Sequence, residues 1–517
     1  MLLHDFLDFY GRTTPHAEFV AERDRSLTYG EARRATNRIA NALLGAGLQK
    51  GDRFGLVAKN SIEYALIYFA ASKAGVVPVP LNYRLAAPEW QFILDDADAQ
   101  LVFADGEFCD ALMPVVENLA DVQALVALGA DAPSGTPKLS DWAGKASEEH
   151  PKSSVKSTDD VIQMYTSGTT GRPKGAVLTH HSACSNVAQF APSTRDGLRG
   201  RILLAPPLYH IAAACILFNG VAYGESFLLH RDFDPQATVQ SLQNDGVGML
   251  MAVPAIIQAC VAVPGVDQAS YPRLRCIGYG GSVIAEEVLR RALEVFDCDF
   301  FQGYGMTESS PILTLLTPED HRRGLAGEGG LLLSAGRAVA ATDLYIADAS
   351  DEEVPLGTMG EIVARGPQLM RCYWKRERAT KETLRGGWLH TGDAATMDEE
   401  GYVFIQDRMK DMIVSGGENV YPREVEEVLF KHPAIADAAV IGVPSERWGE
   451  TIHAVIVGKG EDRPDAEALG EFCREHLGGY KIPRSVEWLD ALPRNPSGKV
   501  LKRVLREPHW EGRERKV

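Results

Sequence analysis

The chain has 517 residues, of which 45% are hydrophobic and 24% are charged, which is the composition of a folded globular protein rather than a disordered, collagen-like or coiled-coil one. At roughly 150 residues per domain, this length predicts about three domain-sized units, or one large domain with a smaller companion. The 53 Lys and Arg residues against 70 Asp and Glu residues give a net charge of −17, which argues against a nucleic-acid partner or a binding surface for anionic lipid.

The first 150 residues alternate between helix-like and strand-like patterns. Thr28 and Glu31 form a capping-box pattern, which predicts that a helix begins there. Residues 53–58 and 75–80 read as strands, and residues 61–73 between them read as an apolar helix. This βαβ order predicts parallel strands in an α/β layer architecture. Further strands of the same kind are predicted at residues 100–104, 161–164 and 246–253.

One long uncharged stretch raises the question of a membrane span. Residues 202–224 carry no Asp, Glu, Lys or Arg and are long enough to cross a bilayer. Pro206, Pro207 and His210 interrupt the stretch, so a buried pocket wall is favoured over a transmembrane helix. The N-terminal residues, which include Asp5, lack the basic and apolar regions of a signal peptide, and no integral membrane contact is predicted.

The pattern changes in the last third of the chain. Short alternating stretches separated by Gly and Pro at residues 328–366 predict a small β region. From near Lys410 a separate α+β domain is expected, with helices at residues 423–431 and 466–477 and strands at 435–443 and 451–457. The predicted fold class is therefore α/β: a large N-terminal domain of stacked α/β lobes plus a small β region, followed by a small α+β C-terminal domain.

The cysteines and histidines are scattered along the sequence. The eight cysteines occur singly with no C-x-x-C pair, and His180 and His181 form the only adjacent pair of histidines. We therefore predict neither a zinc site nor a disulfide framework, and the reducing cytoplasm is the expected location.

The most informative stretch is residues 165–175, with the sequence YTSGTTGRPKG. Its glycines and hydroxyl side chains would let backbone and side-chain donors surround an anion, and Lys174 adds a positive charge. Pro173 and the strand-like sequence after Lys174 exclude a Walker A loop, in which a helix follows the lysine. A polar hairpin between two strands is the alternative interpretation.

Four further motifs follow in order along the chain. They are YGMTE at 304–308, GWLHTGD at 387–393, DRMKDMIVSGGEN at 407–419 and PRNPSGK at 493–499. Together with the loop at 165–175 they resemble the signature motifs of the AMP-forming adenylating superfamily, which includes acyl-CoA synthetases, peptide-synthetase adenylation domains and firefly luciferase. Within it, the chain most resembles the bacterial acyl-CoA ligases. An accidental hairpin would not reproduce five motifs in this order.

The resemblance implies ATP as a substrate and Mg²⁺ as a cofactor. Tyr304 would stack on adenine, Asp393 would accept hydrogen bonds from the ribose hydroxyls, and Glu308 with Thr170 would bind Mg²⁺ through hard oxygen ligands. The implied nucleotide-binding residues are Thr166, Ser167, Gly168, Thr169, Thr170, Lys174, Gly281, Ser282, Gly303, Tyr304, Gly305, Met306, Thr307, Asp393 and Arg408.

The same resemblance implies two half-reactions in one active site. The acid would attack the α-phosphate of ATP to give an acyl-adenylate, and a thiol would then displace AMP. No protein nucleophile is required, and none is recognisable in the sequence. The implied catalytic residues are Lys499, Glu308, Thr307 and His210. Between the half-reactions, a mobile C-terminal domain at 412–517 would rotate against the N-terminal domain at 1–406 about a hinge at 407–411, with Lys410 as the pivot.

After rotation, a glycine loop would replace Lys499 and line a pantetheine tunnel. The implied CoA-binding residues are Gly416, Gly417, Trp448, Tyr480, Lys481 and Arg484. Ile482 departs from relatives in which a basic residue can occur at this position.

The identity of the acid is less constrained. The residues implied for the acyl pocket are His210, Ala213, Ala214, Gly280, Ser310 and Pro311. Amino-acid adenylation domains place an aspartate near this segment to pair the substrate ammonium, whereas residues 211–220 contain no acidic side chain. We therefore expect a fatty or aryl acid in an apolar pocket.

Two alternatives to an acyl-CoA ligase stay open. The first is an acyl-AMP ligase that loads a carrier protein; relatives of that kind often carry an insertion before the hinge, and no surplus stretch is evident between Gly366 and Lys410. The second is a nucleotide-binding regulator without turnover, which the presence of Lys499, Glu308 and Asp393 disfavours. The expected partners are a carboxylic acid and CoA, and a homodimer is left open.

Overall fold

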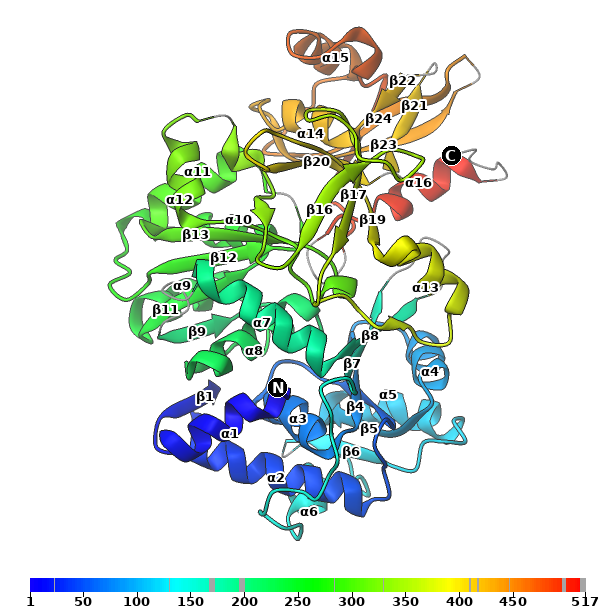
Figure 1. The fold of residues 1–517 in the computed structure, drawn as a ribbon. Helices are drawn as coiled ribbons and strands as arrows, with labels where there is room; N and C mark the ends of the chain where they lie inside the picture. Colours follow the sequence, from blue (N-terminus) through cyan, green and yellow to red (C-terminus); the bar gives the residue numbers. More distant parts are fainter. Residues whose placement is uncertain are drawn as a thin grey trace.

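The structure is a computed structural model that describes residues 1–22, 24–129, 131–166, 173–194, 200–282, 284–328, 330–408, 411–415, 418–445, 447–494 and 499–511. The chain forms two α/β lobes, a small β region beside them, and an α+β unit made by the C-terminal residues, coloured orange to red at the top of Figure 1. This architecture confirms the predicted fold class.

The first lobe is built on a parallel sheet with the strand order β4-β3-β5-β6. Its strands are β3 (Arg53–Val57), β4 (Val77–Leu81), β5 (Ala99–Asp105) and β6 (Leu125–Leu128). One core cluster packs helices α2 (Tyr29–Gly45) and α3 (Ile62–Ala74) on one face of the sheet, and another packs α4 (Ala87–Asp96) and α5 (Gly106–Glu117) on the other. The predicted βαβ unit is therefore confirmed. The lobe also contains α1 (Leu3–Thr13) and α6 (Leu139–Ala143).

The predicted capping box starts helix α2. The Thr28 hydroxyl accepts a hydrogen bond from the backbone N–H of Glu31 at 3.3 Å, and the Glu31 carboxylate accepts one from the backbone N–H of Thr28 at 2.8 Å. Two N–H groups that the helix leaves without partners are thereby satisfied.

The second lobe contains a nine-stranded sheet in the described chain, with the order β15-β14-β13-β12-β11-β9-β10-β1-β2. The strands from β13 to β1 in this order pair in parallel. Their bounds are β1 (Glu18–Glu22), β2 (Arg25–Thr28), β9 (Arg201–Leu204), β10 (Phe227–Leu229), β11 (Val247–Ala252), β12 (Cys276–Gly280), β13 (Asp299–Tyr304), β14 (Thr314–Leu316) and β15 (Arg337–Ala338).

Helices cover both faces of this sheet (Figure 1). Helices α7 (His180–Thr194) and α8 (Ile211–Tyr223) lie between the sheet and the first lobe, and α9 (Pro235–Asn244), α10 (Pro254–Val261) and α11 (Glu286–Phe296) pack on the opposite face. The uncharged stretch at 202–224 thus folds as most of β9 and the buried helix α8. Among the described residues, no helix has the length and apolar character needed to cross a membrane.

Two smaller sheets connect the lobes. One has the order β18-β8-β7, and the other, β16-β17-β19-β20, forms the predicted small β region. That region continues to residue 408 rather than ending near 366, because β19 and β20 complete the sheet by antiparallel pairing. The elements are β7 (Asp160–Thr166), β8 (Lys174–Thr179), α12 (Pro318–Leu325), β16 (Asp343–Ala347), β17 (Gly360–Arg365), β18 (Cys372–Tyr373), α13 (Glu377–Thr383), β19 (Leu389–Met397) and β20 (Val403–Arg408), with short 3-10 turns η1 (Val266–Gln268), η2 (Thr307–Ser309), η3 (Leu331–Leu333) and η4 (Arg385–Gly387).

From residue 411 onward, the described strands pair only with one another. They are β21 (Ile413–Ser415), β22 (Glu418–Val420), β23 (Ile435–Ser445), β24 (Gly449–Gly458) and β25 (Ser485–Leu489), with helices α14 (Pro422–Leu429), α15 (Ala466–Arg474) and α16 (Lys502–Trp510) and the turn η6 (Gly479–Lys481). The predicted strands and helices of this region are present, although α15 ends at Arg474 instead of continuing to 477. Strand β25 and helix α16 were not expected from the sequence.

Candidate active site

A cavity of about 440 Å³ lies between the C-terminal unit and the second lobe. Residues from four of the five recognised motif regions or their neighbours reach it, although they are spread along the sequence from Gly281 to Lys499. The predicted site residues that line it are Gly281, Ser282, Gly303, Tyr304, Gly305, Asp393 and Lys499.

The parallel strands β12 and β13 explain why the glycine-rich segments meet here. Both strands end at the same edge of the sheet, and the cavity lies beyond that edge, where ligands bind in open α/β sheets. A Cβ atom at Gly280 would lie 2.4 Å from the Gly303 carbonyl oxygen, and one at Gly305 would lie 1.8 Å from the Pro311 carbonyl oxygen. Only glycine fits at these two positions, so the backbone itself forms this wall.

Asp393 and Tyr304 are joined across the cavity wall. The Tyr304 hydroxyl donates a hydrogen bond of 2.7 Å to the Asp393 carboxylate. The backbone N–H of Asp393 donates to the Thr391 hydroxyl at 3.1 Å, and Gly392 adopts a left-handed backbone conformation with φ of +72°. This turn within β19 directs the carboxylate toward the end of β13, so an aromatic ring and an acceptor for hydroxyl groups lie next to each other.

Glu308 is buried next to the start of the phosphate loop. Glu308 is only 3% exposed. One of its carboxylate oxygens accepts hydrogen bonds from the Tyr373 hydroxyl at 2.5 Å and from the Thr166 hydroxyl at 3.3 Å. No ion pair of Glu308 occurs within the described part of the chain. Among the described residues, Glu308 therefore has neutral hydrogen-bond donors but no cationic partner. A buried carboxylate of this kind is a suitable ligand for a hard divalent cation such as Mg²⁺.

The two ends of the phosphate loop are held by a β hairpin. Thr166 at the end of β7 pairs with Lys174 at the start of β8, which confirms the strand predicted after the loop. The ammonium of Lys174 lies 5.2 Å from the centre of the Tyr373 ring. Ser167, Gly168, Thr169 and Thr170 lie outside the described residues.

Lys499 reaches the cavity from the C-terminal unit. Arg494 and Val500 form an antiparallel bridge, and the backbone N–H of Leu501 donates to the Pro493 carbonyl at 2.8 Å. These contacts hold the residues that follow Lys499, which lines the same cavity as Asp393. Two further cations of the C-terminal unit line this cavity and form ion pairs: Lys502 pairs with Glu426 at 2.8 Å and Arg494 with Asp437 at 2.5 Å.

The residues expected to contact CoA form a cationic and aromatic patch on the C-terminal unit. The guanidinium of Arg484 lies 5.7 Å from the centre of the Trp448 ring, and that of Arg447, which sequence analysis did not select, lies 4.6 Å from it. Lys481 pairs with Glu424 and lies 5.5 Å from the ring of Tyr480, which is 44% exposed. Gly416, Gly417 and Lys410 lie outside the described residues, and so does the side chain of Arg408.

The residues expected in the acyl pocket lie on separate elements. His210, Ala213 and Ala214 lie at the start of α8, and Ser310 and Pro311 follow the turn η2. His210 caps helix α8, and its Nδ1 accepts a hydrogen bond from the backbone N–H of Ala212 at 3.3 Å; burial lowers its pKa to about 4, so the ring is neutral at pH 7. Ala213 and Ala214 are fully buried in the main core. Ser310, next to Pro311, has a buried hydroxyl with no hydrogen-bond partner in the described chain.

Sequence reasoning missed Tyr373 and Arg423. Tyr373 follows no motif, yet its hydroxyl contacts Glu308. Arg423 lines the cavity from α14 and donates a hydrogen bond to the Ile405 carbonyl, which joins α14 to β20. It also pairs with Glu427 of its own helix at 2.8 Å. Neither residue carries a local sequence signal, because each contact depends on the packing of distant segments.

The chain resembles known proteins along nearly its whole length. The family described as AMP-binding enzyme matches residues 8–374, and the family described as AMP-binding enzyme C-terminal domain matches residues 424–499. The chain is 40% identical to a feruloyl-CoA synthase of Amycolatopsis sp over 496 residues, which cover 96% of both chains. It is 38% identical to the fatty acid–[acyl-carrier-protein] ligase ScoC of Streptomyces coeruleorubidus over 516 residues, which cover 98% of this chain and 96% of that one. A solved o-succinylbenzoate CoA synthetase from Bacillus subtilis, in complex with its acyl-adenylate intermediate, is 31% identical, with a TM-score of 0.83 and 97% of each chain covered.

Proposed function

We propose, from the premise that this chain belongs to the AMP-binding enzyme family, that it activates a fatty or aryl carboxylic acid as an acyl-adenylate and transfers the acyl group to CoA. The chain is an AMP-forming acyl-CoA ligase, because family matches and ligase relatives extend over nearly its whole length. The single observation that carries the proposed mechanism is that Lys499, Asp393 and Tyr304 line one cavity.

The chain's own residues support the first half-reaction. We assign the Tyr304 ring to the adenine and the Asp393 carboxylate to the ribose hydroxyls, since the two lie next to each other on the cavity wall. Lys499 would stabilise the negative charge that grows on the α-phosphate while the substrate carboxylate attacks it, and pyrophosphate leaves. Glu308 and Thr170 would hold Mg²⁺, and the ion would neutralise phosphate charge when bound.

The second half-reaction requires that the thiol reach the same carbonyl. We propose that the unit at 412–517 turns about residues 407–411, with Lys410 as the pivot, so that Lys499 leaves and the loop containing Gly416 and Gly417 lines the thiol path. The patch of Trp448, Arg447 and Arg484 would then contact the nucleotide part of CoA, because guanidinium groups beside an aromatic ring suit a phosphorylated purine. His210, neutral at pH 7, would lie beside the reacting acyl group without adding charge.

The acyl side of the proposal rests on the absence of charge in its candidate residues. His210, Ala213, Ala214, Gly280, Ser310 and Pro311 supply no fixed ion that could pair with a second substrate charge. Because Ala213 and Ala214 are packed in the core, we place the pocket wall at the start of α8, around His210, with these alanines setting the position of the helix behind it. A fatty or aryl body fits such a wall better than a polar one.

Purified protein tested with a panel of acids gives the direct check. We expect ATP-dependent release of pyrophosphate and AMP with fatty or aryl acids, and little with α-amino acids or dicarboxylic acids of similar size. Each accepted acid should be offered with CoA and, in parallel, with a phosphopantetheinylated carrier protein. Thioester formed only on the carrier protein would support the alternative suggested by the similarity to ScoC, and absence of turnover with every acid would contradict the proposed substrate class.

Asn substitution of Asp393 tests the ribose contact. Because a hydrogen bond to a charged acceptor contributes about 1.5 to 3 kcal/mol, Asp393→Asn should raise the KM for ATP on the order of tenfold or more, with a much smaller change in the KM for the acid. Tyr304→Phe is the matched control, since it removes the hydroxyl bound to Asp393 but keeps the ring. Equal effects of Asp393→Asn on both KM values would contradict the assignment.

A cytoplasmic location and a homodimer complete the proposal. All eight cysteines are free, which suits a reducing compartment. Light scattering of the purified chain would determine the oligomeric state, and localisation of a tagged chain would determine the compartment.

A further inference from the structure

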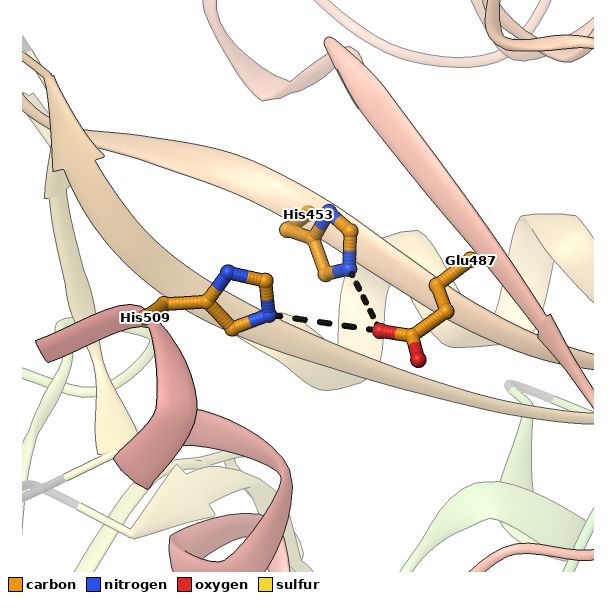
Figure 2. Close-up of side chains that lie close together, drawn as sticks. All are labelled: His453, Glu487 and His509. Carbon is orange, nitrogen blue, oxygen red and sulfur yellow. Dashed lines mark ion pairs between the residues drawn. The ribbon is translucent and has the colours of Figure 1, made fainter.

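Two histidines and a glutamate meet on the C-terminal unit, away from the active-site cavity. Figure 2 shows His453 on β24, Glu487 on the neighbouring strand β25 and His509 near the end of α16, with both imidazole rings directed toward the carboxylate of Glu487. The Nε2 atoms of His453 and His509 lie 3.6 Å and 4.0 Å from the same oxygen of Glu487. The three ligand atoms all lie within 4.8 Å of one another.

The His453 side chain is buried and has one nitrogen directed into this cluster. Its side chain is 7% exposed, and its Nε2 has no hydrogen-bond partner among the described residues, because the Glu487 oxygen is beyond hydrogen-bond distance. The other ring nitrogen, Nδ1, lies 2.7 Å from the Ser485 hydroxyl, which can accept a hydrogen bond from its N–H group. This arrangement fixes the ring and leaves Nε2 as an electron-pair donor, as in metal-bound histidines whose second nitrogen donates to a neighbouring group.

The donor set fits a transition-metal ion. Two imidazole nitrogens and one carboxylate oxygen are ligands that Zn²⁺ accepts at about 2.0 to 2.2 Å, and closing the observed separations around one ion needs movements of about 1 Å. The Glu487 and His509 side chains are 48% and 31% exposed, so an ion can enter and water can complete the coordination. We propose that His453, Glu487 and His509 form a binding site for a divalent transition-metal ion of the Zn²⁺ type.

Such an ion would anchor helix α16 to the sheet. The helix already packs Leu505 against the cluster of Ala439, Ile441, Val443, Val455 and Leu492, and Trp510 donates from its indole nitrogen to the Gly442 carbonyl at 3.0 Å. An ion bound jointly by side chains of α16, β24 and β25 would add a third attachment at the C-terminal end of the helix. This inference concerns a site separate from the cavity and does not depend on the proposed function.

Metal titration of the full chain tests the site. After chelator treatment and desalting, the protein is titrated with ZnCl₂ alone by calorimetry, and Co²⁺ is used separately as a spectroscopic probe of coordination by nitrogen and oxygen. We expect one ion per chain. No binding of either ion by the unsubstituted protein would overturn the proposal.

Substitution at the partly exposed positions separates ligand loss from misfolding. Glu487→Gln and His509→Gln should each weaken Zn²⁺ binding at least tenfold without a large change in the melting temperature measured in chelator, whereas His453→Gln removes a buried side chain and carries the greater risk to stability. His476→Gln, an exposed histidine of the same unit, is the matched control and should bind like the parent. Undiminished one-to-one binding by the double variant Glu487→Gln/His509→Gln would overturn the assignment.

Hydrogen exchange checks the anchoring. Zn²⁺ should slow amide exchange in α16 of the parent chain and of His476→Gln, and should leave α16 exchange unchanged in His509→Gln. Zn²⁺ binding without any added protection of α16 would overturn the anchoring role.

Discussion

Replacing Lys499 with alanine is expected to abolish formation of the acyl-adenylate while sparing thioester formation from supplied acyl-adenylate and CoA. Lys499 lines the same cavity as Asp393, and in the proposed mechanism its ammonium stabilises the negative charge that grows on the α-phosphate during the first half-reaction. Removing a donor of this kind costs about 3 kcal/mol or more in the transition state, which corresponds to a rate loss of at least about a hundredfold. Acid-dependent pyrophosphate release measures the first half-reaction, and CoA thioester formed from synthetic acyl-adenylate measures the second.

Lys459→Ala provides a matched control for this prediction. Lys459 is an exposed lysine of the same unit and lines the same cavity, so its removal changes the net charge equally. It should retain most of the adenylation activity. If both half-reactions of Lys499→Ala fell to the same extent, or if Lys459→Ala were as impaired, the specific role assigned to Lys499 in the first step would be wrong.

Glu308→Gln is expected to lower the rate of adenylation by roughly a hundredfold to a thousandfold and to raise the Mg²⁺ concentration needed for half-maximal rate. The amide oxygen of Gln can still accept hydrogen bonds from Tyr373 and Thr166, so the substitution removes mainly the negative charge. The shape of the buried site is therefore kept. Pyrophosphate release at graded Mg²⁺ concentrations, together with the melting temperature, measures both effects.

Tyr373→Phe distinguishes charge from orientation at this site. It deletes the hydroxyl that binds Glu308 but leaves the carboxylate charged, and we expect a rate loss much smaller than that of Glu308→Gln. An unchanged Mg²⁺ requirement in Glu308→Gln would argue against Glu308 as a metal ligand. A melting temperature that drops strongly in Glu308→Gln would instead indicate a structural role.

The sequence determined the local elements and pointed to the candidate site residues. The Thr28 capping box, the βαβ order of the first lobe and the strand after the phosphate loop are patterns within a few residues, and local propensity and hydrophobic periodicity are sufficient to specify them. Asp393, Tyr304 and Lys499 stood out because each lies in a short motif whose residue types resemble a known family. The sequence, however, did not give the distances in space between these motifs.

Tertiary packing decided which of these residues meet. Only the folded chain shows that Lys499 reaches the cavity wall formed by Asp393 and Tyr304, and that Ala213 and Ala214 belong to the core. Tyr373 and the cluster of His453, Glu487 and His509 carry no recognisable spacing, because ligands separated by tens of residues come together only through strand pairing and helix docking. Spacing arguments predict no zinc site because they detect ligands that are close in the sequence, whereas the side chains of the proposed metal site come from β24, β25 and α16.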